Sequence, residues 1–485
     1  MTESRRFRAA FAVLLFAVAT TIPSVGQTFN TLATFDGSNG NYPVQALSQG
    51  PDGALYGVTY FGGSQNGGEI FKLTRQGKLT VVYDFCSESN CADGFSPDSP
   101  LLLADDGNFY GTTYFGGANS AGTIFRFSSA GKITTIYSFC SLSNCADGAY
   151  PNGALAQSPE GEIYGSTGGG GNPLCYEGGC GTVFSIALDG AFTTRYVFCS
   201  QTNCSDGAIP SGGVSLSSDG NFYGATTFGG LGACGIVYPG CGTVFNIDPA
   251  GVLTLIHRFC SQDKCPDGLE PDSGLVQASN GYLYGVTSTT IFKLNAAGTL
   301  TTLYTFCQQQ SCPTGVAPFT LIEGTDRNLY GANEEGGQQN GGNVFNIRLD
   351  GSDFHVLYSF CSESGCDGGF QPMGGLVQAT NGEFYGTTSD GGVGGSGIVY
   401  SLDGGLKPFV AFVRSYGKVG QKIGILGQGF TGTTSVSLNG TAASFRVVSD
   451  TFIEATVPVG ATTGYVTVTT PGGTLTSNVP FRVLP

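Results

Sequence analysis

Residues 101–139 read LLLADDGNFYGTTYFGGANSAGTIFRFSSAGKITTIYSF, and this stretch decides the fold. It holds four short runs in which aromatic and β-branched residues alternate with polar ones, as strands with one buried face require. Asp106-Gly107 is a two-residue hairpin signal between the first two runs. The runs are 101–104, 109–113, 123–127 and 133–139. The stretch therefore predicts four antiparallel strands.

Three sequence marks repeat this pattern along the chain. A hydrophobic residue followed by Tyr-Gly recurs with its tyrosine at Tyr56, Tyr110, Tyr164, Tyr223, Tyr284, Tyr330 and Tyr385. A Phe followed by Cys recurs at Phe85, Phe139, Phe198, Phe259, Phe306 and Phe360, and Phe35 is a first copy without the Cys. A Pro opens the next segment at Pro43, Pro97, Pro151, Pro210, Pro271, Pro318 and Pro372. Seven four-stranded units of about 54 residues are typical of a β-propeller.

The two ends of the repeat complement each other. Residues 28–35 read as a fourth strand without the three that precede it, and the seventh unit ends at 398–402 with a third strand that lacks its fourth. We therefore predict a seven-bladed β-propeller over 27–402, closed by the N-terminal strand, because closure removes exposed sheet edges. An open β-solenoid is the alternative, and it predicts capping repeats instead of complementary partial units.

The first residues have the pattern of a signal peptide. Basic residues precede the apolar run 9–19, and small residues follow it at Ser24 and Gly26. The basic residues are Arg5, Arg6 and Arg8. We predict cleavage after Gly26, which removes 1–26 and places the protein outside the cytoplasm, secreted, periplasmic or at the cell surface. The apolar run is shorter than the roughly 20 residues that cross a bilayer, and no second run occurs, so we expect no membrane span.

The sixteen cysteines fall into eight close pairs, which supports export. In an exported chain such pairs predict local disulfides. Zinc is the alternative, but zinc sites prefer C-x2-C to C-x4-C spacing. The predicted disulfides join Cys86 with Cys91, Cys140 with Cys145, Cys175 with Cys180, Cys199 with Cys204, Cys234 with Cys241, Cys260 with Cys265, Cys307 with Cys312, and Cys361 with Cys366.

The repeat gives way to a second pattern near the C-terminus. Residues 403–406 read as a linker, and 407–485 contain no Cys and several short alternating strands, the pattern of a β-sandwich. The segment resembles an IPT/TIG domain, which has an immunoglobulin-like fold. The stretches that carry this resemblance are Gly427-Gln428-Gly429-Phe430, Val436-Ser437-Leu438-Asn439-Gly440, Val457-Pro458 and Thr469-Thr470-Pro471-Gly472-Gly473. The resemblance implies a binding or spacer module and no reaction.

Residues 28–402 resemble the GloVer tandem-repeat family of exported bacterial proteins. The resemblance rests on Asp-Gly-x-x-Tyr-Gly-Thr-Thr, as at 106–113, and on Gly-Thr-Val-Phe, as at 242–245. It implies export and a bacterial source, and it implies no particular ligand.

Composition excludes several classes of function. The formal net charge is −15, so the surface repels phosphate backbones and we expect no nucleic-acid partner. The chain has two His and no Trp, and it lacks G-x-S-x-G, P-loop and H-E-x-x-H motifs. No D-x-D-x-D-G calcium loop occurs either, so we predict no cofactor and no metal, and we expect a monomer.

Propeller topology sorts the loops by face and selects the candidate site. The Cys-bearing connections and the loops after each second strand share one face, and binding usually resides on such loops. We expect aromatic side chains there to stack on a ligand, or otherwise to pack between blades. These are Tyr60, Phe61, Tyr114, Phe115, Tyr176, Phe228 and Tyr238. Acidic candidates on the same face are Glu334, Glu335 and Asp390.

The repeated acids after the Cys pairs have a simpler explanation. They precede Gly, as turn residues do, so we interpret them as scaffold and not as catalysts. These acids are Asp93, Asp147, Asp206 and Asp267, and Thr314 takes their place in one unit.

Three functions remain open, of which a non-catalytic one is favoured. The first is an exported binding or surface-interaction protein that recognises an extracellular glycan or surface protein through the loop face. The second is a polysaccharide-active hydrolase or lyase in which Glu335 and Asp390 flank a bond, which requires them within about 10 Å. The third is a purely structural extracellular protein.

Overall fold

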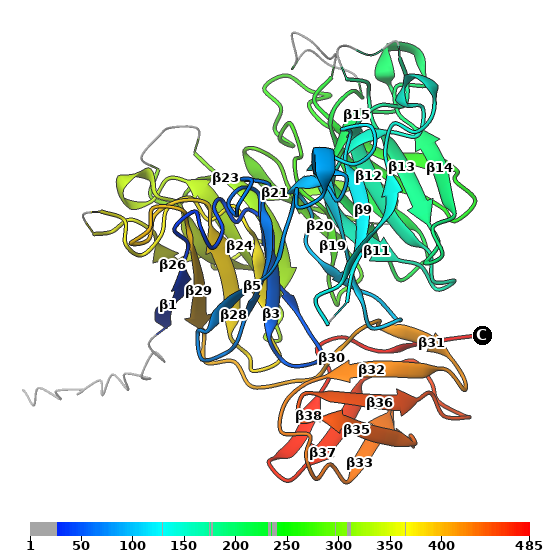
Figure 1. Cartoon of the computed structure of the whole chain (residues 1–485), viewed down its shortest axis with the longest axis vertical. Helices are drawn as coiled ribbons and strands as arrows, with labels where there is room; N and C mark the ends of the chain where they lie inside the picture. Colours follow the sequence, from blue (N-terminus) through cyan, green and yellow to red (C-terminus); the bar gives the residue numbers. More distant parts are fainter. Residues whose placement is uncertain are drawn as a thin grey trace, which may run out of the picture.

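A computed structural model describes residues 27–128, 130–173, 175, 178–230, 234, 240–295, 297–307, 312–363 and 365–485. The predicted signal peptide and the candidates Tyr176 and Tyr238 lie outside these residues. Within them the protein is all-β (Figure 1), and its helical segments are single 3-10 turns. These are η1 (Ser89–Cys91), η2 (Ser143–Cys145), η3 (Thr202–Cys204) and η4 (Gln338–Asn340). No helix in the described part of the chain has the length and apolar character needed to cross a bilayer.

The repeat region, residues 27–403, consists of seven antiparallel units. Unit 1 contains β2 (Ser48–Gln49), β3 (Leu55–Thr59), β4 (Glu69–Leu73) and β5 (Leu79–Asp84). Unit 2 contains β6 (Phe95–Pro97), β7 (Leu102–Leu103), β8 (Phe109–Phe115), β9 (Thr123–Phe127) and β10 (Ile133–Ser138). Unit 3 contains β11 (Ala149–Gln157), β12 (Ile163–Gly169), β13 (Thr182–Ile186) and β14 (Phe192–Val197). Unit 4 contains β15 (Ala208–Leu216), β16 (Phe222–Phe228), β17 (Thr243–Ile247) and β18 (Leu253–Arg258).

The remaining units follow the same order. Unit 5 contains β19 (Val276–Gln277), β20 (Leu283–Val286), β21 (Thr290–Leu294) and β22 (Leu300–Thr305). Unit 6 contains β23 (Val316–Glu323), β24 (Asn328–Glu335), β25 (Asn343–Arg348) and β26 (His355–Ser359). Unit 7 contains β27 (Leu376–Gln378), β28 (Phe384–Thr388), β29 (Ile398–Asp403) and, as its fourth strand, β1 (Thr28–Thr34). Units 3 and 4 share one eight-stranded sheet, because β11 and β15 form a parallel bridge between Ala154 and Gly213.

The first strand of the repeat region completes the last unit. β1 pairs antiparallel with β29, from Thr28 opposite Asp403 to Thr34 opposite Ile398. In Figure 1 the blue start of the chain accordingly lies against the yellow strands of unit 7. The pairing extends to Asp403, one residue beyond the end of the strand expected from the sequence.

Apolar side chains fill the space between consecutive units. The described residues form seven such clusters, one for each pair of neighbours, and the cluster between units 7 and 1 includes Phe35, Phe71 and Tyr385. The repeated Tyr-Gly has a structural cause. Tyr56 is buried against unit 2, while a Cβ on Gly57 would lie 2.5 Å from the Phe71 ring. The tyrosine thus joins two units and the glycine leaves room for the ring beneath it.

The residue before each repeated Pro has a left-handed backbone in several units. Tyr42 has φ 62° and Tyr150 has φ 58°, although a residue before Pro normally adopts an extended conformation. The N–H of Tyr42 donates to Ser396 O (3.2 Å), and that of Tyr150 donates to Ala121 O (2.8 Å). Each acceptor belongs to the preceding unit. This unusual conformation therefore provides hydrogen bonds between neighbouring units.

The structure forms all eight disulfides predicted from the spacing, and none of the described cysteines is free. Because each bond joins cysteines only five or seven residues apart, it closes a local loop and does not connect two units. The bonds are Cys86–Cys91, Cys140–Cys145, Cys175–Cys180, Cys199–Cys204, Cys234–Cys241, Cys260–Cys265, Cys307–Cys312 and Cys361–Cys366.

The acid two residues after a Cys pair holds the loop together. Asp147 is buried and accepts hydrogen bonds from Tyr137 Oη (2.8 Å), Ser141 N (2.9 Å), Ser141 Oγ (2.9 Å) and Leu142 N (3.1 Å). Asp93 and Asp206 accept the same set in their own connections. The interpretation of these acids as scaffold therefore agrees with their contacts.

The last two Cys-bearing connections differ from this arrangement. After Cys312 the acid is replaced by Thr314, whose Oγ1 lies 3.2 Å from Cys312 Sγ. After Cys366 the equivalent position is Gly368, and the nearest acid, Asp367, directly follows the cysteine. These two connections therefore keep the disulfide but lack the carboxylate that closes the others.

In several of the Cys-bearing connections, the second cysteine also binds the loop that follows the second strand. Gly171 N donates to Cys145 O (2.8 Å) in unit 3, Gly337 N donates to Cys312 O (2.7 Å) in unit 6, and Gly392 N donates to Cys366 O (3.0 Å) in unit 7. The contact is thus present with or without the repeated acid. The Cys-bearing connections and these loops form one surface, called the loop face below.

The C-terminal region, residues 404–485, contains two four-stranded sheets around one core. Ile425 and Ile453 of the first sheet and Val436 and Val468 of the second meet in a single buried cluster. The first sheet contains β30 (Ala411–Phe412), β32 (Lys422–Leu426), β36 (Phe452–Thr456) and β35 (Phe445–Ser449). The second contains β34 (Thr441–Ala442), β33 (Ser435–Leu438), β37 (Val466–Thr470) and β38 (Gly473–Thr476). A parallel pair is formed by β31 (Tyr416–Lys418) and β39 (Arg482–Leu484).

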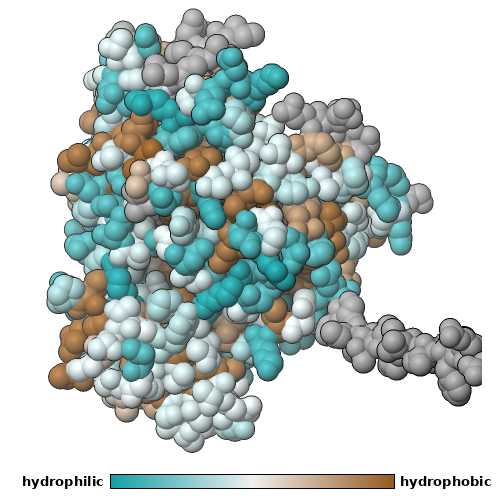
Figure 2. All heavy atoms as spheres, turned by 180° about the vertical axis from the view of Figure 1, so that it is seen from behind, coloured by the Kyte–Doolittle hydropathy of each residue, from teal (hydrophilic) through white to brown (hydrophobic). Residues whose placement is uncertain are grey.

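The C-terminal region packs on the hairpin turns between the first and second strands of the units, called the turn face below (Figure 1). Tyr416 Oη donates to Gln157 O (2.6 Å), and Thr451 Oγ1 donates to Pro51 O (2.7 Å). Arg414 pairs with Asp105. On the side of the molecule opposite to the view of Figure 1, hydrophobic residues form separate patches that hydrophilic residues divide (Figure 2). The turn face is thus partly covered, which leaves the loop face as the accessible surface of the repeat region.

Candidate functional site

Two groups of aromatic rings lie on the loop face of units 1 to 3. In the first group, the ring centroid of Tyr60 lies 4.7 Å from Phe61 and 6.4 Å from Tyr42. In the second, Tyr114 stacks on Tyr150 at 5.2 Å with 22° between the ring planes. Together with Phe115 these side chains are called the aromatic strip, and its members are Tyr42, Tyr60, Phe61, Tyr114, Phe115 and Tyr150.

The aromatic strip remains accessible to a ligand. Phe115 is 39% exposed, and the other five members are half-buried. The two groups are neighbours, because Tyr114 and Asp98 both contribute to the electrostatic environment of Tyr60. Burial is the main cause that raises the pKa of Tyr60 to about 12, and Asp98 and Tyr114 make smaller contributions to this shift. The Tyr60 hydroxyl therefore stays protonated near neutral pH and can donate a hydrogen bond.

Carboxylates surround this strip. Burial raises the pKa of Tyr42, and the nearby carboxylates of Asp390, Glu334 and Asp98 add to the effect. Asp98 accepts a hydrogen bond from Gln45 Nε2 (2.8 Å), and loss of contact with water raises its pKa to about 7. Burial and the adjacent Glu335 also raise the pKa of Glu334. Aromatic faces and hydrogen-bonding carboxyl groups thus meet at one place.

The structure brings most of the described candidate residues together and places one of them elsewhere. Four aromatic candidates, Tyr60, Phe61, Tyr114 and Phe115, come together, and Glu334 and Asp390 lie around Tyr42. Phe228 packs instead against the core between units 3 and 4.

Two acids keep local partners. Glu335 lies at the end of β24, opposite Val316. Asp390 bridges to Phe370 and accepts a hydrogen bond from Ser389 Oγ (2.9 Å). Its carboxylate nevertheless remains one of the charges that raise the pKa of Tyr42.

Sequence reasoning missed three members of this site. Tyr42 and Tyr150 precede the repeated Pro, and Asp98 follows it. The Pro was the available signal, because residues at equal offsets from a repeated mark occupy equivalent places on the loop face.

Replacing Asp98 with Asn is expected to change how stability depends on pH. The folded protein keeps the Asp98 proton up to about pH 7, whereas an unfolded chain releases it near pH 4. The wild type therefore loses stability as the pH rises between these values. The variant has no titratable group at this position, so its stability should not fall for this reason. At pH 8 the variant should be more stable by at least about 1 kcal/mol, and at pH 4 the difference should vanish. Denaturant unfolding at both pH values measures this, and an equal difference at both would contradict it.

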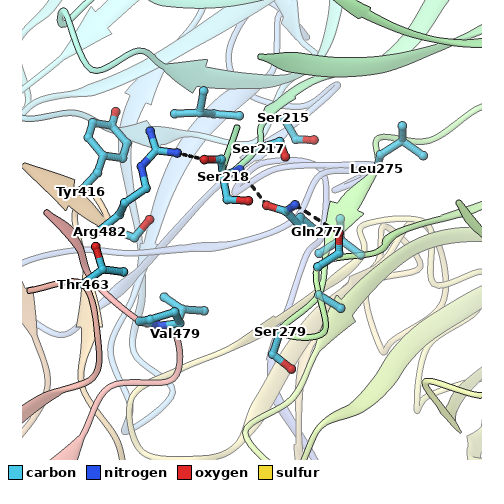
Figure 3. A pocket seen from close by; sticks show the side chains of 16 residues that line it. Ser215, Ser217, Ser218, Leu275, Gln277, Ser279, Tyr416, Thr463, Val479 and Arg482 are labelled. Carbon is cyan, nitrogen blue, oxygen red and sulfur yellow. Dashed lines mark hydrogen bonds between the residues drawn. The ribbon is translucent and has the colours of Figure 1, made fainter. Parts of the chain in front are cut away.

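A cavity lies where the C-terminal region meets the turn face (Figure 3). It has a volume of about 480 Å³. Several of its polar groups already have partners within the protein. Arg482 donates to Ser218 O, Ser218 N donates to Gln277 Oε1 (2.8 Å), and Tyr416 Oη donates to Gln157 O. These contacts connect the two regions, so we do not place ligand recognition there.

Four-stranded units and a loop-face site define a tandem-repeat protein with a β-propeller-like fold. The chain belongs to the Gloeobacter/Verrucomicrobia repeat family, whose sequence profile matches residues 17–238, 93–290 and 239–445. No curated protein matches the sequence. The family match agrees with the resemblance noted for the repeat in the sequence.

Solved structures resemble the chain in fold. A catalytically inactive virginiamycin B lyase from Staphylococcus aureus with quinupristin is 14% identical with a TM-score of 0.51, over 78% of this chain and 99% of the lyase. A streptogramin B lyase gives 14% identity and the same TM-score, over 78% of this chain and 98% of its own. The extracellular domain of a one-component system from B. thetaiotaomicron is 10% identical with a TM-score of 0.50, over 95% of this chain and 58% of its own. At these identities the likeness concerns the fold alone.

Proposed function

We propose that the protein is an exported, non-catalytic binding protein whose loop face recognises an extracellular glycan. In this proposal residues 27–402 form a closed seven-bladed β-propeller. The pairing of β1 with β29 and the apolar cluster between units 7 and 1 support closure. A closed ring holds the loops in fixed positions, as a recognition surface requires.

The rest of the chain fits the same proposal. Residues 1–26 are a signal peptide, and the eight disulfides support export because such bonds persist in oxidising compartments. Residues 403–406 are a linker, and 407–485 are an immunoglobulin-like IPT/TIG domain. Two sheets around one core support this assignment. The domain rests on the turn face and serves as a spacer, so that the loop face points away from it.

The aromatic strip with its surrounding carboxyl groups is the observation that carries the proposal. Aromatic rings present flat apolar faces of the kind that pack against the C–H faces of sugar rings. Tyrosine hydroxyls and the carboxyl groups of Glu334 and Asp390 can exchange hydrogen bonds with sugar hydroxyls.

Replacing Tyr60 or Tyr114 with Ala should weaken glycan binding by at least about tenfold, which corresponds to the loss of about 1.4 kcal/mol of stacking and hydrogen bonding. A glycan array identifies the ligand, and calorimetry measures the affinity of each variant. The control is Tyr282→Ala, which removes an exposed tyrosine on the turn face. Unchanged affinity in both loop-face variants would overturn the assignment of this site.

A polysaccharide hydrolase or lyase is the second candidate. It is favoured by Asp98, whose pKa near 7 is suited to proton transfer and which lies beside Tyr60 and Tyr114. Incubation with the glycans found on the array distinguishes the two. Turnover that Asp98→Asn abolishes would support the enzyme. If the protein shows no glycan binding and no turnover, a structural role is the remaining candidate.

A further inference from the structure

Unit 1 contains a pair of acidic residues that the other units lack. Glu69 begins β4 and lies directly opposite Asp84, the last residue of β5. Like charges in this arrangement repel each other. The residues at the position of Glu69 in units 2 to 7 are Thr123, Thr182, Thr243, Thr290, Asn343 and Ile398. The negative charge at this position is therefore a feature of unit 1 and is not shared by the other units.

These carboxylates have oxygen atoms without partners among the described residues. Glu69 is only 2% exposed, and its Oε2 accepts no hydrogen bond from them. Asp84 Oδ2 accepts from Ser64 N (3.0 Å) and Ser64 Oγ (2.6 Å), whereas Asp84 Oδ1 is buried and accepts none from this part of the chain. Neither acid takes part in an ion pair there. A buried carboxylate without compensation costs several kcal/mol, so the pair calls for a positive partner.

The two side chains converge beneath glycine backbone. A methyl group on Gly63 would lie 2.2 Å from Asp84 Oδ1 and 3.2 Å from Glu69 Oε1. One on Gly40 would lie 3.1 Å from Glu69 Oε2. Both glycines also have positive φ, 78° at Gly63 and 117° at Gly40. These positions therefore favour Gly because of the backbone conformation as well as the lack of space for a side chain. Oxygen atoms of both acids thus border the same small space.

A third acid approaches from the connection that follows β1. Asp36 takes the place of the first Cys in the other connections and accepts hydrogen bonds from Ser38 and Asn39 of its own turn. Its charge, after burial and Asp84, helps to raise the pKa of Glu69 to about 7. The connection that follows β1 therefore has an acid where the other connections have the first cysteine of a disulfide.

We propose that Glu69 and Asp84 bind one Ca²⁺ ion, with Asp36 adding negative charge nearby. An all-oxygen ligand set is the choice of hard divalent cations, and Ca²⁺ tolerates irregular geometry better than Mg²⁺ does. In this proposal the ion joins β4 to β5 beside the connection after β1, which contains no cysteine. The sequence predicted no metal, because the three acids lie far apart along the chain and form no calcium-loop motif.

The test is calcium binding by the whole purified protein after treatment with EDTA. Calorimetry at pH 7.5 should show one Ca²⁺ per chain, and saturating CaCl₂ should raise the Tm by at least about 2 °C. Glu69→Thr and Asp84→Ser should each weaken binding by at least tenfold and remove the Tm shift. Both variants carry residues found at the equivalent positions of unit 2, so they should fold. The control is Glu88→Thr, which removes an exposed acid of the next connection and should leave binding unchanged.

Two results would overturn the proposal. One is the absence of heat and of a Tm shift up to about 10 mM CaCl₂, above the range of weak extracellular calcium sites. If Glu69→Thr then also stabilises the protein in EDTA, the pair holds a proton instead of a metal. The other is calcium binding that Glu69→Thr and Asp84→Ser leave unchanged, which would place the ion elsewhere. Calcium binding at this pair does not depend on the glycan-binding function.

Discussion

Replacing Phe35 with Ala is expected to lower the free energy of unfolding by about 3–5 kcal/mol. Phe35 follows β1 and is fully buried, and its ring centroid lies 5.1 Å from that of Phe71 in unit 1. The substitution leaves a cavity in the cluster that joins units 7 and 1, and it removes an edge-to-face ring contact. Urea unfolding followed by circular dichroism measures the loss.

The matched control for this variant is Leu142→Ala. Leu142 is 56% exposed in the connection between units 2 and 3, so its loss should cost less than about 0.5 kcal/mol. A cost below about 1 kcal/mol for Phe35→Ala would contradict the conclusion that the junction of units 7 and 1 is packed as tightly as a core.

Replacing Asp147 with Ala is the second change with a large expected effect, about 3 kcal/mol. Its carboxylate satisfies the hydroxyls of Tyr137 and Ser141 and two backbone N–H groups, and all of these donors lose their acceptor at once. Hydrogen bonds to a charged acceptor contribute more than those between neutral groups, so losing several of them at once is costly. Thermal and urea unfolding of the oxidised protein measure the change.

Asp189→Ala is the control for this prediction, because Asp189 is exposed and caps only the turn at Ala191. It should cost less than about 0.5 kcal/mol. If Asp147→Ala were equally mild, the repeated acid would not be a scaffold residue, and its repetition would need another explanation.

The fold could be predicted from the sequence because the repeated marks report local geometry. Tyr56 and Gly57 recur as a pair since one side chain bridges two units and the other must be absent for Phe71 to fit. The contact of the C-terminal region with the turn face could not be predicted. It relies in part on single side chains that donate to backbone carbonyls, as Thr451 does to Pro51 O. Every residue has such a carbonyl, so the sequence does not indicate which one accepts the hydrogen bond.

The candidate site was predictable only in part, for a conformational reason. Tyr60 directly follows β3 and Tyr114 lies near the end of β8, so their place on the loop face follows from the strand order. Tyr42 and Tyr150 reach the same face through a left-handed backbone before Pro, where an extended one is expected. The acids of unit 1 come together because neighbouring strands pair, and pairing register is not apparent from either strand alone.

The pairing of β1 with β29 also determines the order of events when the chain folds. β1 is among the first segments to be synthesised, but its partner is the last strand of the repeat region. No intermediate length of chain can complete unit 7, and contacts between residues so distant in sequence form slowly. A chain that is still being synthesised therefore keeps this unit open, and unit 7 is completed only after the final strand of the repeat region has been made.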